Sequence, residues 1–263
     1  MMRIGSVPYL NAKPMVDWFH SPECDSPVEV VYAVPSRLAE MLREGSVDVA
    51  NVSIFEMFQN PDLILIPDLS ISACGAVKSV RLFSKKPLHE IESVALDTSS
   101  LTSNALLRIL LKEQFGITPC YSHHTPDIYA MLESHDAGLI IGDLKLFEGL
   151  PDTVVYDLGQ AWYDLTGLPF VYAAWSARRD RVSLEMCETL HRAMGWGSQC
   201  LETLAAHWAG RWNLPVELAT DYLVNVMDYR LAERQMAGLR LYQQKCFEQG
   251  LTGELHPIEA FQP

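Results

Sequence analysis

Asn11 is the first side chain in this sequence whose position suggests chemistry. The apolar residues Ile4–Val7 predict a short strand, and the pattern of Lys13–Phe19 predicts a helix that Asn11 would cap. Small anionic ligands collect where a strand ends and a helix begins in open α/β sheets. Because its amide is polar but does not ionise, Asn11 favours recognition of a small molecule over binding of a metal ion.

A second candidate site is a hydroxyl-rich stretch between a short apolar strand and a long helical pattern. Its sequence is Asp97-Thr98-Ser99-Ser100-Leu101-Thr102-Ser103. Hydroxyl groups and unpaired backbone N–H groups at one helix N-terminus suit a carboxylate or a phosphate. We therefore expect at least two of these side chains to contact ligand, and the competing interpretation is a plain helix cap with spare surface serines.

Other polar residues also follow predicted strands. Ser53 begins a short helix, and Gly142-Asp143 ends the strand AGLII. Glycine permits a close approach of the backbone there, while Asp143 would cap a helix or accept a ligand hydroxyl. Simple capping explains each residue alone, but their shared position at strand ends favours one cleft. His123 and His124 are predicted to point to opposite faces of a strand, so we expect no metal site.

Composition and missing motifs narrow the classes of function. The 263 residues are 49% hydrophobic with a formal net charge of -13, which supports a sizeable core and argues against nucleic-acid binding. No G-x-G-x-x-G, P-loop, H-E-x-x-H or G-x-S-x-G motif occurs, so we expect no cofactor. We find no secretion-signal pattern, no apolar run near the ~20 residues of a membrane span, and six scattered cysteines. These features predict a cytoplasmic protein with reduced cysteines that does not associate with a membrane.

The elements that must position these residues alternate between strands and helices, which predicts a mainly parallel sheet covered by helices. In the first third, apolar runs predict strands at Ile4–Val7, Val28–Val34, Val47–Val52 and Leu63–Ile66, and helices at Lys13–Phe19, Arg37–Arg43 and Ser53–Phe58. Ala76–Ser84 follows as an extended strand, and we place the crossing into a second lobe near Leu88–Glu92.

The second lobe repeats the same alternation. Its predicted elements are strands at Ser93–Leu96, Pro119–Ser122, Ala137–Ile141 and Thr153–Tyr156, and helices at Leu101–Phe115, Thr125–Glu133 and Leu144–Leu150. Thr166–Pro169 is predicted as a hinge turn, and Leu168–Ser176 as a strand that returns to the first lobe. Amphipathic helices then cover the first lobe, at Leu184–Trp212 (with a break near Gly195–Gly197 as an alternative), Val216–Tyr229 and Ala232–Gln249.

Together these elements predict an α/β fold of two lobes that close like a clamshell. Residues 1–90 and 170–263 form the larger lobe with the C-terminal helices, and residues 91–169 form the smaller lobe. Ligands bind between such lobes, at the carboxyl ends of the strands.

Four segments, in order, resemble the chorismate dehydratases of the futalosine route of menaquinone biosynthesis. They are RIGSVPYLNAKP, SACGAVKSVRLFS, VALDTSSLTSNALLRILL and WYDLTGLPFVYAAW, and the resemblance runs from Arg3 to about Gly250. It implies a fold like that of type II periplasmic binding proteins and the removal of water from chorismate to give 3-[(1-carboxyvinyl)oxy]benzoate. The sister enzyme of that route, 1,4-dihydroxy-6-naphthoate synthase, shares the fold but typically opens with a Pro-Cys-Pro-Asn type segment. The opening Pro8-Tyr9-Leu10-Asn11 here favours the dehydratase.

The resemblance also implies roles for the candidate residues. A carboxylate of the substrate is understood to take the proton in that family, and Asn11 would then be the catalytic residue that orients the substrate or steadies the leaving hydroxyl. The residues expected to bind substrate are Tyr9, Ser53, Ser79, Thr98, Ser99, Ser100, Thr102, Gly142 and Asp143. Asp97, Asp143 and Tyr9 remain candidates for a protein acid or base, whereas Lys13 is expected to face solvent.

Two other functions stay open at this point. A solute-binding protein for a small carboxylate would have the same fold, although the missing secretion signal counts against it. The sister synthase is the second alternative, because it acts on a different substrate with the same architecture. Neither the oligomeric state nor the extent of lobe closure follows from the sequence.

Overall fold

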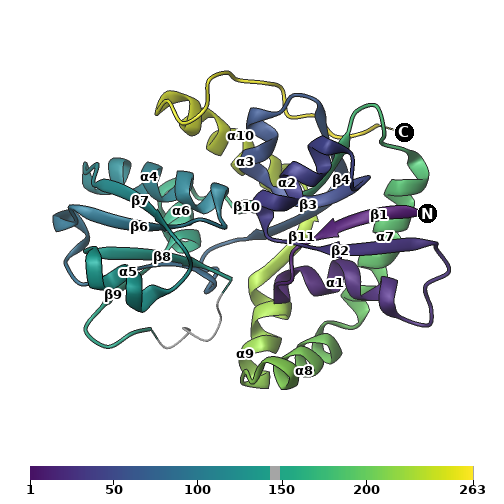
Figure 1. Cartoon of the computed structure of the whole chain (residues 1–263), viewed down its shortest axis with the longest axis horizontal. Coiled ribbons are helices and arrows are strands. Elements are labelled where there is room, and N and C mark those ends of the chain that lie inside the picture. Colours follow the sequence, from purple (N-terminus) through teal and green to yellow (C-terminus); the bar gives the residue numbers. More distant parts are fainter. Residues whose placement is uncertain (143–148, 263) are drawn as a thin grey trace.

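The computed structural model describes residues 1–142 and 149–262, and the chain forms two α/β lobes (Figure 1). The larger lobe contains a six-stranded sheet in the order β11-β4-β10-β3-β1-β2. Its strands are β1 Met2–Ser6, β2 Val28–Tyr32, β3 Val49–Ser53, β4 Leu63–Ala73, β10 Phe170–Arg178 and β11 Met227–Leu231. Strand β1 runs parallel to β2 and β3, whereas β10 is antiparallel to β3 and β4, and β11 is antiparallel to β4.

The smaller lobe contains a five-stranded sheet in the order β7-β6-β8-β5-β9. Its strands are β5 Val80–Ser84, β6 Ser93–Asp97, β7 Cys120–His124, β8 Ala137–Ile141 and β9 Val154–Asp157. Strand β6 is parallel to β7 and β8, and β5 is antiparallel to β8 and β9. Each lobe therefore has a parallel portion, as the alternation of strands and helices predicts.

Helices cover the faces of both sheets (Figure 1). The α-helices are α1 Lys13–Val16, α2 Pro35–Glu44, α3 Ile54–Gln59, α4 Leu101–Phe115, α5 Ile128–Ser134, α6 Leu158–Thr166, α7 Leu184–Gln199, α8 Leu201–Trp212, α9 Val216–Asp221 and α10 Glu233–Glu248. Short 3-10 helices are η1 Leu10–Ala12, η2 Asp17–His20 and η3 Leu88–Glu90, and η5 Tyr222–Val226 is a π-helix. Across residues 1–142 and 149–262, none of these helices has both the length and the apolar character to cross a membrane.

Helix α4 illustrates how local sequence places a functional element. At its N-terminus, the Ser100 side chain accepts a hydrogen bond from the backbone N–H of Ser103 at 3.2 Å. At its C-terminus, Gly116 adopts the left-handed conformation with φ +67, which ends the helix. The helix thus spans the predicted residues 101–115, and its first turn faces the larger lobe, where Thr102 contacts Ser53.

The C-terminal helices pack mainly on the larger lobe, as predicted. Helix α7 packs on α1 and β4, and α8 packs on α1 and α9. Helix α10 packs on β10 and β11 but also reaches α4 of the smaller lobe. There, Lys245 Nζ lies 2.6 Å from Glu113 Oε2, and the Tyr242 hydroxyl donates to the Thr102 carbonyl oxygen at 2.9 Å. The last long helix therefore connects the two lobes.

The chain first crosses between the lobes earlier than residues 88–92. Strand β5 pairs with β8 and β9 in the smaller sheet, so the crossing lies between β4 and β5, at residues 74–79. Gly75 and Lys78 have φ values of +100 and +64 in this segment. The predicted strand at residues 76–84 is therefore extended only from Val80, because its first residues form the crossing. The chain returns to the larger sheet at Phe170, where the sequence places the return.

The predicted helix at residues 216–229 is wrong in its last three residues. Helix α9 ends at Asp221, η5 follows, and β11 begins at Met227. In β11, Met227, Tyr229 and Leu231 are buried while the intervening residues are less buried, which is the two-residue period of a strand. Pairing with the distant strand β4 decides this local choice.

Other boundaries also differ from expectation. The long helix at residues 184–212 breaks at Cys200 rather than at residues 195–197, and the first helix continues only as η2 beyond Val16. Strand β4 continues past residue 66 to Ala73 with irregular pairing, although Asp68 at φ +60 interrupts its regular backbone. Asp127, rather than Thr125, caps α5 through its carboxylate. Most of the predicted helix at residues 144–150 lies outside the described residues.

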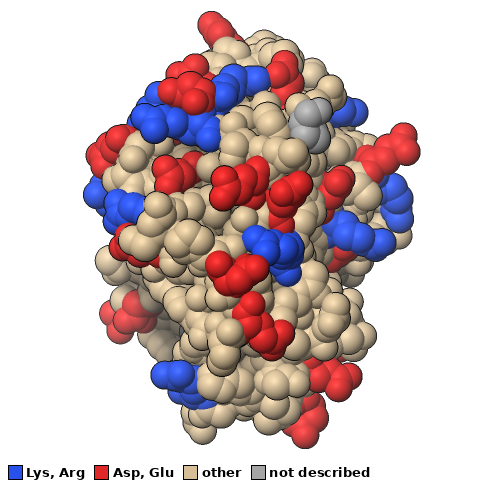
Figure 2. Space-filling view, turned by 90° about the vertical axis from the view of Figure 1, so that its right-hand side faces the viewer, with Lys and Arg blue, Asp and Glu red and all other residues tan. Residues whose placement is uncertain are grey.

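Charged side chains of both signs are mixed on the face that Figure 2 shows. With a net charge of -13, the molecule carries more acidic than basic groups, and that face has no continuous basic patch. A basic surface is what the phosphate backbone of a nucleic acid requires. The charge distribution on this face therefore agrees with a small-molecule site as the functional centre.

Candidate active site

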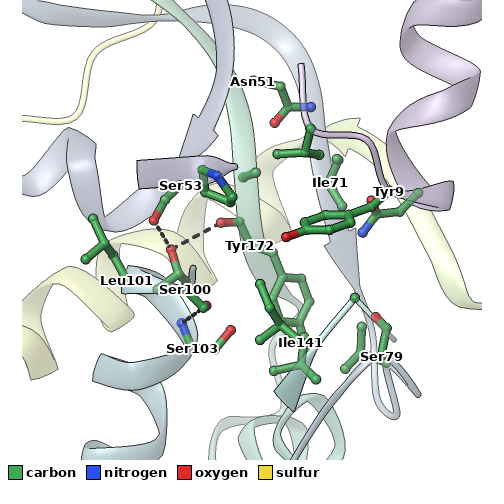
Figure 3. A pocket seen from close by; sticks show the side chains of 18 residues that line it. Tyr9, Asn51, Ser53, Ile71, Ser79, Ser100, Leu101, Ser103, Ile141 and Tyr172 are labelled. Carbon is green, nitrogen blue, oxygen red and sulfur yellow. Dashed lines mark hydrogen bonds between the residues drawn. The ribbon is translucent and has the colours of Figure 1, made fainter. Parts of the chain in front are cut away.

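A pocket opens between the two lobes, beside the segments that follow β1, β3 and β8 (Figure 3). It measures about 610 Å³, including space open to solvent. Its lining consists of Val7, Tyr9, Asn11, Pro35, Asn51, Ser53, Ile71, Val77, Ser79, Val80, Ser100, Leu101, Thr102, Ser103, Ile141, Gly142, Tyr172 and Ala173. None of these lining residues in the described part of the chain is Lys or Arg. An anionic ligand here would be held by neutral hydrogen-bond donors.

Thr102 and Ser53 meet across the lobes. Their hydroxyl oxygens lie 2.5 Å apart, and the backbone N–H of Phe55 donates to Thr102 Oγ1 at 3.3 Å. The Thr102 hydroxyl also lies 3.3 Å from the carbonyl oxygen of Tyr172, to which it donates. Because the Thr102 hydroxyl already has these partners, it joins the lobes in this structure.

Ser100 presents a hydroxyl to the pocket from the start of α4. Its oxygen accepts from the backbone N–H of Ser103 (Figure 3), which leaves the hydroxyl hydrogen to donate to another acceptor. Thr98, by contrast, is exposed and does not line the pocket, so the structure does not bring its side chain to the other candidates. The hydroxyl-rich stretch is therefore divided between a pocket side and a solvent side.

Tyr9 links the pocket to the smaller lobe through a chain of hydrogen bonds. Its hydroxyl is hydrogen-bonded to the Ser99 side chain, and Ser99 donates to the Asp97 carboxylate through both its hydroxyl and its backbone N–H, the latter at 2.8 Å. The other Asp97 oxygen accepts from the backbone N–H of Ile141 at 3.3 Å. Burial raises the pKa of Tyr9, the bond to Ser99 opposes this, and the negative charge of Asp97 adds to it. Tyr9 therefore stays protonated at neutral pH, with a buried carboxylate two hydrogen bonds away.

Gly142 meets the expectation of a close backbone approach. Its φ of +71 suits glycine, and a Cβ at this position would lie 3.2 Å from the Tyr9 ring. A larger residue would strain the backbone and push Tyr9 out of place. Asp143, the other candidate at this strand end, lies outside the described residues.

Asn11 and Ser79 approach each other at a buried tyrosine. Tyr9, rather than Asn11, occupies the N-cap position of η1, so Asn11 lies inside the turn and does not cap the helix as predicted. Ser79 Oγ lies 2.8 Å from the hydroxyl of Tyr222, and the Asn11 side chain lies near the same hydroxyl, where η1 contacts η5. Asn11 Oδ1 is buried and has no hydrogen-bond partner among the described residues.

Sequence patterns alone did not indicate that Asn51, Tyr172 and Tyr222 belong to the site. Asn51 is 1% exposed in the middle of β3, where Nδ2 donates to the sulfur of Met15 at 3.5 Å. Asn51 Oδ1 and the Tyr172 hydroxyl are buried without a hydrogen-bond partner in the described part of the chain. Such atoms are rare in folded proteins, and both residues line the pocket, so a ligand would satisfy them. An amide inside the apolar run VDVANV was the available signal for Asn51.

Lys13 does not face solvent, contrary to expectation. Its side chain is buried, and Nζ lies 3.7 Å from the ring centre of Trp208 and 4.8 Å from that of Tyr32. Burial lowers the pKa of Lys13, and the negative charge of Asp17 opposes this effect. The prediction failed because α8 covers this side of the short helix α1, a contact between residues far apart in the sequence.

The two adjacent histidines lie away from the pocket. The ring of His124 packs edge-on against His135 with ring centres 4.7 Å apart, and Ser122 Oγ lies 2.6 Å from His135 Nε2. Within residues 1–142 and 149–262, no three His, Cys, Asp or Glu side chains are grouped to hold a metal ion. The groups that converge on the pocket are instead hydroxyls and amides, which recognise carboxylates and hydroxyls.

Solved structures with the same fold include periplasmic binding proteins. Protein AF1704 from Archaeoglobus fulgidus superposes with a TM-score of 0.77 at 19% identity, covering 95% of this chain and 98% of that one. The aliphatic sulphonate binding protein SsuA from Escherichia coli superposes with a TM-score of 0.69 at 19% identity, covering 100% of this chain and 92% of that one. These similarities confirm the predicted α/β fold of the periplasmic-binding-protein type.

Proteins similar in sequence to this chain include two chorismate dehydratases. A chorismate dehydratase from Thermus thermophilus is 34% identical over 232 residues, 81% of this chain and 84% of the relative. A chorismate dehydratase from Campylobacter jejuni is 26% identical over 250 residues, 93% of this chain and 97% of the relative. Residues 2–248 match the family described as menaquinone biosynthesis. With that match across almost its whole length, the chain belongs to the menaquinone biosynthesis family.

Proposed function

We propose that the protein is a chorismate dehydratase, which removes water from chorismate to give 3-[(1-carboxyvinyl)oxy]benzoate for menaquinone biosynthesis. The observation that carries the proposal is the 34% identity to the Thermus thermophilus chorismate dehydratase over 81% of the chain. The pocket supports it, because hydroxyl donors and an unpartnered Asn11 oxygen suit a substrate with two carboxylates and one hydroxyl.

The reaction needs positioning more than strong acids or bases. A base removes the hydrogen from the ring carbon that bears the enolpyruvyl ether, and the electrons of that C–H bond enter the ring. The hydroxyl on the neighbouring ring carbon leaves with the electrons of its C–O bond. Proton and hydroxide together make one water, and the ring becomes aromatic, so neither an oxidant nor a reductant is consumed. The protein then has to orient the substrate and stabilise the departing oxygen.

A carboxylate of the substrate itself is the base in this proposal. Ser79, Ser100 and the N-terminus of α4 bind the carboxylates, since a helix N-terminus and hydroxyl hydrogens both favour negative charge. The described lining residues that face the carboxylate are neutral hydrogen-bond donors, which bind it without adding a positive charge of their own. Asn11 holds the hydroxyl that departs.

A protein group is the alternative acid or base within the same reaction. The chain Tyr9–Ser99–Asp97 reaches the pocket, and burial raises the pKa of Tyr9. A protonated Tyr9 would donate to the departing hydroxyl, and the nearby charge of Asp97 keeps the phenol protonated until then. Comparison of Tyr9→Phe with Asp97→Asn separates the two routes, because substrate-assisted proton removal needs neither group.

The direct test is incubation of the purified protein with chorismate. We expect the absorbance of the diene to fall while a substituted benzoate, lighter by one water, accumulates on chromatography with mass detection. No product at high enzyme concentration would reject the proposal. Tight binding of a small carboxylate without turnover would point to a solute-binding protein. Consumption of cyclic dehypoxanthine futalosine in place of chorismate would point to 1,4-dihydroxy-6-naphthoate synthase.

A further inference from the structure

We propose that Tyr222 is a positioning residue for the dehydration, because its hydroxyl sets the orientation of both Asn11 and Ser79. Tyr222 is 2% exposed and is not part of the pocket lining, so it acts through these two side chains. The inference rests on the proposed function, since it assigns a role in that reaction. It adds a residue from the C-terminal segment to a site whose described lining otherwise comes from residues 7–142 and from β10.

The backbone at Tyr222 is irregular where its side chain is needed. Tyr222 begins the π-helix η5, directly after α9 and before β11. A π-turn changes the direction of the side chains that follow a helix and occurs frequently at functional sites. Here it places the phenol oxygen 2.8 Å from Ser79 Oγ, a residue 143 positions away in the sequence.

The hydrogen-bond directions follow from the donors available. Asn11 Oδ1 has no hydrogen-bond partner among the described residues, so Nδ2 is the Asn11 group that can donate toward the Tyr222 hydroxyl. In this proposal the Tyr222 oxygen accepts from Nδ2, and the single Tyr222 hydrogen is directed to Ser79 Oγ, 2.8 Å away. Ser79 keeps its own hydrogen, and Asn11 keeps its carbonyl oxygen. One tyrosine thereby orients the Ser79 hydroxyl, which can donate to a carboxylate, and the Asn11 carbonyl oxygen, which can accept from a hydroxyl.

Tyr222 keeps its proton while it does this. Burial raises the pKa of Tyr222 to about 12, although the bonds to Ser79 and Asn11 oppose the shift. The hydroxyl is therefore a fixed donor and acceptor at neutral pH and does not exchange a proton with the substrate. Its loss should change the rate without changing the shape of the pH–rate profile.

The test compares Tyr222→Phe with a matched control, Tyr229→Phe. Tyr229 is a second buried tyrosine, and its hydroxyl has no hydrogen-bond partner in the described part of the chain. We expect Tyr222→Phe to lower kcat for chorismate by about 10- to 100-fold with a smaller change in KM, because misplaced groups slow the chemical step. Tyr229→Phe should stay within about twofold of the wild type.

Double variants separate positioning from general damage. In an Asn11→Ala, Ser79→Ala background, Tyr222→Phe should add less than about twofold, because nothing remains to be positioned. In the Ser79→Ala background it should still lower kcat, since Asn11 depends on the same hydroxyl. The double variant Ser79→Ala, Tyr222→Phe also serves if Tyr222→Phe alone fails to fold. It removes both partners of the buried Ser79–Tyr222 hydrogen bond and leaves neither of them unpaired.

Distinct outcomes would overturn the inference and the proposed function. Four results would each reject the positioning role. They are an unchanged kcat in Tyr222→Phe, an altered pH profile of that variant, an equal loss of kcat in Tyr229→Phe, and an equal loss of kcat when Tyr222→Phe is added to the Asn11→Ala, Ser79→Ala background. Lack of turnover by the wild-type protein would reject the proposed function instead, before any variant is compared.

Discussion

Single side chains in the cleft divide into those that hold the protein together and those that remain open to a ligand. The hydroxyls of Ser53 and Thr102 bind each other across the lobes. Asn11, Asn51 and Tyr172 instead each present a buried polar atom without a partner among the described residues. Unpaired buried polar atoms cost free energy unless a ligand completes them. Asn11 combines such an atom with a place beside the Tyr222 hydroxyl, which makes it the strongest candidate for catalysis.

Replacement of Asn11 tests this assignment. We expect Asn11→Ala to lower kcat for chorismate by about 100-fold or more, because the group that orients the substrate hydroxyl is lost. The fold should stay intact, which circular dichroism checks, although the buried Tyr222 hydroxyl loses a neighbouring polar group. The exposed Asn225, changed to Ala, is the control and should retain full activity. Near-normal turnover of Asn11→Ala would reject the catalytic role.

Among the helices, α7 and α1 pack closely enough to admit only glycine at one position. A Cβ at Gly197 would lie 1.8 Å from the carbonyl oxygen of Pro14, which is backbone and has little freedom to move. Pro14 follows Asn11 by three residues, so the same contact also supports the catalytic segment. The glycine that the sequence suggests as a helix break is thus a packing residue inside α7.

Two glycines of α7 give opposite predictions. Gly197→Ala should lower the free energy of unfolding by about 3 kcal/mol or more, because the helices must separate. Gly195→Ala, in the same helix with nothing within 4 Å of its Cβ, should raise it by about 0.5–1 kcal/mol through helix propensity. Urea unfolding of both variants measures the difference. Similar stabilities for the two variants would contradict the close packing.

Over the whole molecule, the lobes are joined by α10 as well as by the two crossing segments. Tyr242 lies on α10 and is 1% exposed. Its ring centre is 5.3 Å from Phe58, 4.9 Å from Phe170 and 6.0 Å from Trp162, and its hydroxyl donates to the Thr102 carbonyl. Aromatic packing and one hydrogen bond therefore hold the C-terminal helix against both lobes, beside the cleft.

Tyr242 allows the two contributions to be separated. Tyr242→Phe should cost about 1 kcal/mol, the net value of one hydrogen bond. Tyr242→Ala should cost about 3–5 kcal/mol, because it leaves a cavity within the aromatic cluster. We also expect a lower kcat for the alanine variant, as the lobes lose a shared support. Equally small losses of stability in both variants, measured by chemical unfolding, would contradict this role of α10.

Local patterns were sufficient for much of the architecture and for part of the site. The alternation of strands and helices, the cap at Ser100 and the glycine at position 142 all depend on residues within a few positions of one another. For this reason the sequence predicts two α/β lobes and brings Asn11 and Ser100 to the same cleft, where the structure also places them. Ser79, which also lines the cleft, was expected there only from the family resemblance. Thr98 was expected in the same cleft, but its side chain is exposed, because a local pattern does not determine which way each side chain of a loop points.

Residues joined across long stretches of chain could be placed only by the tertiary fold. Tyr222 reaches Ser79 over 143 positions, and α8 buries Lys13 although their sequences are far apart. Strand β11 forms where the sequence predicts a helix, because its pairing with β4 outweighs local preference. Periodicity and capping act over a few residues and so determined the elements and their polar ends. Burial and hydrogen-bond partners depend on which elements finally touch, so Asn11 gained Tyr222 as a neighbour only when η5 of the C-terminal segment packed against η1.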